Sequence, residues 1–165
     1  MNALKIFKQA DFNRRFEYLV AEKAKNKIVK SPVYISVGTE HIPVCIESAL
    51  SDNLIQDYSI FAQHRCHSYY LTFIKDPVGL MLELCGCSSG CNQGMGGSAS
   101  ISGKEKGIKM WGHSGLLGDQ VPIGVGYAHA SQEITVVVLG DAAAEEDYVL
   151  GALGYAATKK APVIF

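Results

Sequence analysis

The sequence predicts an α/β fold in which helices cover both faces of a parallel sheet. Five of the six residues from Ile134 to Leu139 are β-branched and none is charged, which is typical of a buried parallel strand. Gly140 ends this run, and residues 142–160 are rich in helix formers, with acidic residues first and lysines last. Residues 161–165 begin another buried strand, so that strand, helix and strand follow one another.

An amphipathic helix is predicted near the N-terminus, over residues 10–27. Asp11 is its candidate N-cap. Its apolar side chains have helical spacing and are Phe12, Phe16, Leu19, Val20 and Ala24. We therefore assign residues 1–30 to an N-terminal packing helix, and we expect the lysine-rich stretch 23–30 to be a solvated helix face.

Further elements are expected between residues 31 and 132, where proline, glycine and apolar spacing mark their limits. They are an extended segment at 31–38, a helix at 42–50, an extended segment at 59–64, a helix at 77–84 and a helix of small residues at 122–132. Residues 86–118 contain ten glycines and predict a long ordered loop. Such loops commonly carry function.

The composition describes one ordinary globular domain, with 165 residues, 48% hydrophobic and 19% charged. A net charge of -1 gives no electrostatic reason to expect a nucleic-acid or membrane partner. No apolar run approaches the roughly 20 residues of a membrane span, and Lys5, Lys8 and Asp11 interrupt any signal-peptide core. We expect a cytoplasmic protein.

The five cysteines are an odd number without secretory context, which favours reduced thiols over disulfides. Cys85, Cys87 and Cys91 lie within seven residues. Their spacing matches no standard zinc or iron–sulfur site, so we favour packing of the loop over metal binding.

Asp141 follows the strand at 134–139 and lies at its C-terminal end, where α/β sheets bind cofactors. A helix begins directly after it. The turn therefore offers backbone N–H groups for a phosphate and a carboxylate oxygen for Mg²⁺. The alternative is that Asp141 only caps the helix.

Seven motifs occur in the order found in one enzyme family. They are Val37–Pro43, His64–Ser68, Asp76–Leu84, Gly90–Ser98, Gly115–Pro122, Gly140–Asp141 and Lys160–Phe165. On these residues the chain resembles the N-terminal half of the α subunit of the thiamine-diphosphate-dependent 2-oxo acid dehydrogenases, the first component of the pyruvate and branched-chain complexes. The resemblance implies a thiamine-diphosphate-binding fold, with residues 31–165 as the N-terminal part of its diphosphate-anchoring domain.

The resemblance assigns the diphosphate to the loop at residues 64–68. In the family, an Arg in a Tyr-Arg-x-His-Gly motif pairs with the diphosphate, and Arg65 has that place here. His64 replaces the family's Tyr next to the cofactor. His67 keeps the family's His and is the candidate catalytic residue, which either orients substrate or holds the loop by hydrogen bonds.

Two turns carry the other implied contacts. The turn at Gly115 matches the segment whose backbone meets the aminopyrimidine, with Leu117 under the bent cofactor. Gly140, Asp141 and Ala142 match the family's Gly-Asp-Gly, in which the backbone approaches the diphosphate. Asp141 would be the first Mg²⁺ ligand.

Several departures from the family's pattern weaken such a site. Ala142 adds a methyl group near the diphosphate, and Ser100 stands where many members have His. The family's second metal ligand, an Asn, falls a few residues past Phe165, and the activating glutamate lies on the β subunit. The chain ends within a core strand, so we expect the fold to be truncated after residue 165 and inactive alone.

The implied function is oxidative decarboxylation of a 2-oxo acid with acyl transfer to a lipoyl group, using thiamine diphosphate and Mg²⁺. The implied partners are a β subunit and a lipoyl-bearing acyltransferase, in an oligomer. One alternative is the N-terminal half of a split transketolase-like enzyme. Another is a truncated subunit that folds without holding cofactor.

Overall fold

A five-stranded sheet forms the centre of the computed structural model, which describes residues 2–29 and 31–165. The strand order is β2-β3-β1-β4-β5, and only β2 runs antiparallel to its neighbour. The strands are β1 (Tyr58–Phe61), β2 (Gly103–Glu105), β3 (Ile108–Trp111), β4 (Thr135–Val137) and β5 (Val163–Ile164). The predicted α/β class with a mainly parallel sheet is confirmed.

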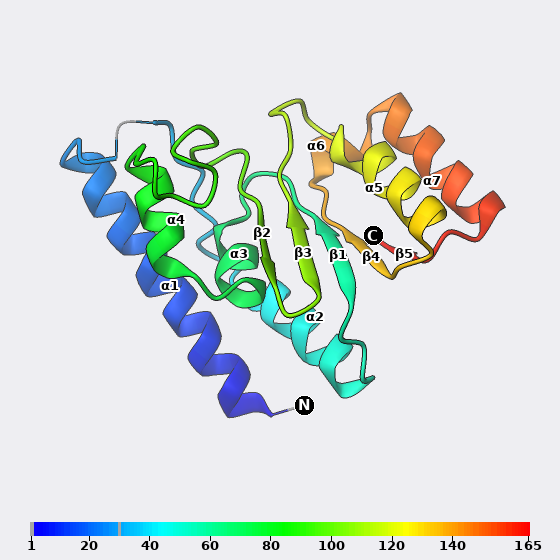
Figure 1. Ribbon diagram of the computed structural model, residues 1–165, viewed down its shortest axis with the longest axis horizontal. Helices are drawn as coiled ribbons and strands as arrows, with labels where there is room; N and C mark the ends of the chain where they lie inside the picture. The colour runs from blue at the N-terminus through cyan, green and yellow to red at the C-terminus, as the bar shows by residue number, and fades with distance from the viewer. Residues whose placement is uncertain (1, 30) are drawn as a thin grey trace.

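Helices pack on both faces of this sheet (Figure 1). One group is α1 (Ala3–Lys25), α2 (His41–Asp52), α3 (His67–Phe73) and α4 (Pro77–Leu84). The other is α5 (Gln120–Ser131) and α7 (Asp147–Lys159), with the short α6 (Asp141–Ala144) following β4. Ile60 and Val136 point into the first core, whereas Phe61 and Val137 point into the second. Successive strand residues therefore serve opposite layers.

Small residues bring α5 close to the sheet, as the sequence predicts. A Cβ atom on Gly124 would lie 2.7 Å from Val137 Cγ2 and 3.1 Å from Phe61 Cγ. Only glycine fits at this contact between α5 and the centre of the sheet.

Two predicted elements are wrong in extent. The long loop over 86–118 contains the β2–β3 hairpin, in which Gly107 turns the chain at φ +90° and β3 pairs with β1. The single helix over 142–160 is two helices, because Glu146 has extended backbone and starts α7. Its acidic neighbours suit a helix N-terminus at this second start.

The face of α1 also differs from the prediction. The helix begins at Ala3 behind the cap Asn2, and Asp11 forms an ion pair with Arg15. Phe12 is 43% exposed and Leu19 41% exposed. The buried residues of α1 are Asn13, Phe16, Glu17 and Val20. Polar side chains can take these positions because all their buried groups find partners. Lys30 of the lysine-rich stretch lies outside the described residues.

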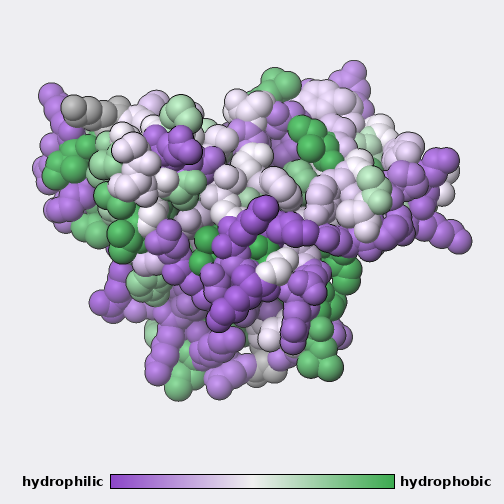
Figure 2. All heavy atoms as spheres, viewed as in Figure 1, coloured by the Kyte–Doolittle hydropathy of each residue, from purple (hydrophilic) through white to green (hydrophobic). Residues whose placement is uncertain are grey.

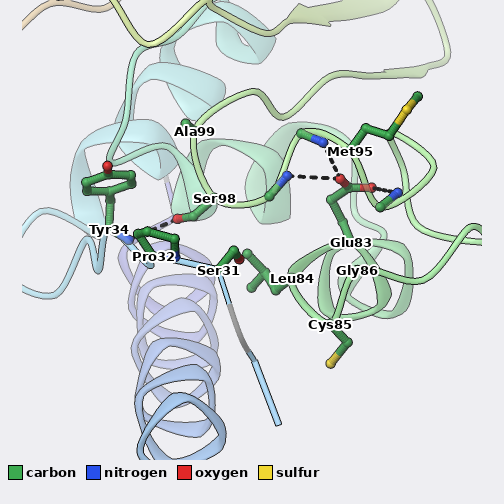
Figure 3. A pocket seen from close by; sticks show the side chains of 13 residues that line it. Ser31, Pro32, Tyr34, Glu83, Leu84, Cys85, Gly86, Met95, Ser98 and Ala99 are labelled. Atoms are coloured by element: carbon green, nitrogen blue, oxygen red, sulfur yellow. Dashed lines mark hydrogen bonds between the residues drawn. The ribbon is translucent and has the colours of Figure 1, made fainter. Parts of the chain in front are cut away.

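Glu83 organises the glycine-rich segment that follows α4 (Figure 3). Its carboxylate is almost wholly buried and accepts four backbone N–H groups. They belong to Asn92 (2.7 Å), Gly94 (2.8 Å), Gly96 (2.7 Å) and Gly97 (3.0 Å). Burial acts to raise the pKa of Glu83, but these four donors outweigh it and the pKa is lowered.

No helix in the described part of the chain is long and apolar enough to cross a membrane. Hydrophilic residues predominate over the β2–β3 hairpin at the centre of the face shown in Figure 2, and hydrophobic groups lie around its rim.

Replacing Glu83 by Gln should lower the free energy of unfolding by about 2–4 kcal/mol, because an amide nitrogen would face backbone donors and leave them unpaired. Urea denaturation measures this loss. Glu22→Gln is the control, since Glu22 is exposed on α1 and should change stability by less than about 0.5 kcal/mol. Equal effects of the two substitutions would contradict this role for Glu83.

Candidate functional site

The predicted cofactor residues follow the C-terminal ends of three neighbouring strands. His64 and Arg65 come after β1, the turn at Gly115 after β3, and Asp141 after β4. Because β3, β1 and β4 are parallel and adjacent, these segments share one edge of the sheet. The chain leaves β1 toward β3 and later crosses back over β1 to β4. Such a change of direction marks the ligand-binding crevice of open α/β sheets.

Two charged residues at this edge, Arg65 and Asp141, are free to meet a ligand. Arg65 and Asp141 are both exposed, and neither side chain has a hydrogen bond or ion pair within the described ranges. Ala142 is exposed as well, and a Cβ atom on Gly140 would meet nothing within 4 Å. A guanidinium and a carboxylate on neighbouring strand ends suit an anionic ligand with a divalent cation.

Side chains of α7 pack against the turn between β3 and α5 and support it. Gly115 has φ +97° with open space around it. Gly118 has φ +88°, and a Cβ atom there would lie 2.8 Å from Val149 Cγ2. The Tyr148 hydroxyl donates to the carbonyl oxygen of Leu117. This turn therefore exposes backbone and the half-exposed Leu117 at the edge of the sheet, on a fixed support.

His113 lies between this turn and the loop after β1. The backbone N–H of His64 points at His113 Nε2 (3.0 Å), and that of Gly115 points at Nδ1 (2.9 Å). The rings of His64 and His113 stack with centroids 5.7 Å apart, and Tyr34 lies 4.7 Å from His64. Burial lowers the pKa of His113; Asp119 opposes this shift and His64 adds to it.

His67, the candidate catalytic residue, is completely buried at the start of α3. Its Nδ1 lies 2.9 Å from Glu17 Oε2, and its Nε2 lies 2.7 Å from Ser98 Oγ. The carboxylate accepts from Nδ1–H, which leaves Nε2 to accept from the Ser98 hydroxyl. Both ring nitrogens are thus engaged, and direct contact with a substrate would require one bond to open.

Three buried polar atoms near the strand ends have no protein partner in the described structure. They are Gln63 Nε2, Asp119 Oδ1 and Gln120 Oε1. The amide of Gln120 is fixed, because its nitrogen donates to the Val138 carbonyl (2.7 Å) and to Gln63 Oε1 (3.4 Å). Unpaired donors and acceptors at a switch point indicate a polar ligand. The Gln63 amide N–H and the Arg65 guanidinium fit a diphosphate, which accepts hydrogen bonds, whereas the oxygens of Asp119 and Gln120 suit a donor group on the ligand.

Sequence reasoning assigned no role to Gln63 or His113. Gln120 and Asp119 stood within the quoted motif Gly115–Pro122, again without a role. Gln120 is the first residue of α5 and is only 1% exposed, which is unusual for a glutamine, but its burial is visible only in the structure. Nothing in the spacing of His113 predicts its contact with His64.

A metal would need ligands besides Asp141. No group of three or more His, Cys, Asp or Glu residues that could hold a metal ion occurs in the described ranges. All five cysteines are free thiols, as predicted. Asp141 can therefore supply one carboxylate to a cation that also binds a diphosphate.

The sequence profile of the family "Dehydrogenase E1 component" matches residues 8–165. The chain belongs to this family. It is 31% identical to the pyruvate dehydrogenase E1 component subunit alpha-1 of Oryza sativa over 98% of its length and 41% of that protein. It is 30% identical to the corresponding alpha subunits of Zymomonas mobilis (98% and 46% covered) and Homo sapiens (99% and 41% covered).

The predicted resemblance to the α subunit is thereby confirmed, and the transketolase-like alternative is not favoured. The chain spans less than half the length of these relatives.

Replacing Gly118 by Ala should lower the free energy of unfolding by about 1–3 kcal/mol, since the residue has positive φ and its Cβ would press on Val149. Gly126→Ala is the matched control, because Gly126 lies within α5 with open space and should be unchanged or more stable by up to about 1 kcal/mol. Chemical denaturation measures the free energy of unfolding of both variants. A Gly118→Ala protein as stable as the unaltered chain would show that this turn does not require glycine.

Proposed function

We propose that this chain forms the diphosphate-anchoring part of the α subunit of a thiamine-diphosphate-dependent 2-oxo acid dehydrogenase. The complete enzyme would decarboxylate a 2-oxo acid oxidatively and transfer the acyl group to a lipoyl group. The observation that carries this proposal is the placement of Arg65, the Gly115 turn and Asp141 on three adjacent strand ends. Membership of the family supports it.

Each of these residues has a defined task in the proposed site. When bound, thiamine diphosphate supplies the electron sink for decarboxylation. Arg65 pairs with phosphate oxygens, for which its planar guanidinium offers two parallel donors. Asp141 binds Mg²⁺, with Gly140 and Ala142 placing the backbone beside the diphosphate. The Gly115 turn and Leu117 hold the aminopyrimidine. His64, whose ring stacks on His113, directly precedes Arg65 and would lie beside the cofactor.

For His67 we propose the second of its two expected roles, which is to hold the loop rather than to contact substrate. Its complete burial and its bonds to Glu17 and Ser98 support this role. Through them, His67 ties the start of α3 to α1 and to the glycine-rich segment, and so fixes the loop that carries Arg65.

Catalysis by this chain alone is not expected. Mg²⁺ requires near-octahedral ligation, and Asp141 gives one ligand. We propose a β subunit and a lipoyl-bearing acyltransferase as partners, within an oligomer. Large apolar side chains exposed on the helices support association. They include Leu4 and Phe7 on α1 and Ile123 and Leu150 on α5 and α7, with Ile164 and Phe165 beside the sheet edge.

Titration calorimetry of thiamine diphosphate with Mg²⁺, with a partner β subunit present, tests the proposal. Asp141→Asn and Arg65→Met should each weaken binding by at least about tenfold, because each removes a charge that faces the diphosphate or its metal.

Asp147→Asn is the control for this titration. Asp147 is an exposed acid six residues further on, at the start of α7, and its loss should leave the affinity unchanged. Absence of binding to the unaltered protein, or equal binding by Asp141→Asn, would overturn the proposed function.

A further inference from the structure

His113 is placed to connect the two loops that carry the proposed cofactor contacts. It is only 6% exposed, in the segment directly after β3. Its Nε2 faces the backbone N–H of His64, which precedes Arg65, and its Nδ1 faces the backbone N–H of Gly115. Both neighbours are main-chain donors, so substitution of their side chains would not remove them.

The imidazole ring cannot accept from both donors at once. A neutral ring has one bare nitrogen and one N–H, and an imidazolium has two N–H groups and no acceptor. One tautomer therefore binds the His64 loop, the other binds the Gly115 turn, and the protonated ring binds neither. Stacking on His64 keeps the ring in place between the two donors.

The charged and titratable groups around the ring favour its neutral form. Burial and the neighbouring His64, on the loop after β1, lower the pKa of His113 from its ordinary value near 6.5. Asp119, at the start of α5, acts in the opposite direction without reversing the shift. The lowered pKa favours the neutral ring at pH 7.

We infer that His113 is a positioning residue, whose neutral ring sets the register of the Arg65 loop and the Gly115 turn by accepting the backbone N–H of one or the other. The expected effect on cofactor affinity rests on the proposed function. The register sets the distance between the anchor for the diphosphate and the support for the aminopyrimidine. Protonation removes the acceptor, so cofactor affinity is present above the pKa of His113 and is lost as the pH falls through it.

A first experiment needs no cofactor. Nitrogen-15 NMR of the free chain, from pH 8 to pH 5, should show His113 titrating below pH 6.5, with the amide signals of His64 and Gly115 moving at the same midpoint. His129, which is exposed on α5, serves as the reference histidine. Titration of His113 above pH 6.5, or amides that do not follow it, would overturn the inference.

A second experiment measures affinity for thiamine diphosphate with Mg²⁺ over the same pH range, with the β subunit present. His113→Phe keeps an aromatic ring but has no acceptor, and should bind about tenfold more weakly at pH 7. His113→Gln keeps an acceptor that does not titrate. It should bind within about threefold of the unaltered protein at pH 7 and lose less affinity on acidification.

These outcomes separate the inference from the proposed function. Protonation of the cofactor's own phosphate affects all three proteins equally, so the difference between the unaltered protein and His113→Gln isolates the histidine. Equal pH profiles for these two, or full affinity in His113→Phe, would refute positioning by His113. If none of the proteins binds the cofactor, the proposed function fails, and the NMR titration still decides whether the neutral His113 ring accepts from the backbone of the His64 loop and the Gly115 turn.

Discussion

The rest of the structure depends on the hydrogen bonds that the buried carboxylate of Glu17, on α1, accepts. It accepts from the backbone N–H and the hydroxyl of Ser36 and from His67 Nδ1, and His67 in turn contacts Ser98. Ser98 also receives the backbone N–H of Tyr34. Four segments distant in sequence are therefore linked through one buried carboxylate. Removing any partner would leave a buried polar group short of a hydrogen bond, which costs about 1–3 kcal/mol.

Carboxylates organise the first half of the chain in two further places. Glu83 gathers four backbone N–H groups of the glycine-rich segment, and Glu40 binds the Arg14 guanidinium through both oxygens. The bond from Arg14 lowers the pKa of Glu40 to about 2, against the opposing effect of burial. Asp141 differs from these acids, because it is exposed at a strand end and no described residue pairs with it. This exposure supports the proposed role of Asp141 as a ligand of Mg²⁺.

The sequence predicted those helices and strands whose limits are marked by residues within the element itself. The apolar run at Ile134–Leu139 and the proline-started helix at 77–84 contain their own evidence, and both are present. The family motifs named His64, Arg65 and Asp141 as cofactor contacts, but their place on one edge was not predicted, because it depends on the parallel pairing of β1 with β4. The buried face of α1 was mispredicted because Glu17 finds its partner His67 fifty residues away, a contact that apolar periodicity does not encode. The contact between His113 and the His64 loop was missed for the same reason.

A crystal structure of the chain in complex with its β subunit, thiamine diphosphate and Mn²⁺ in place of Mg²⁺ would test the account most directly, because anomalous scattering locates the metal. The account predicts the metal beside the Asp141 carboxylate, with the diphosphate between the ends of β1 and β4 and within reach of Arg65. A metal or diphosphate bound elsewhere, with Asp141 and Arg65 left in solvent, would contradict it.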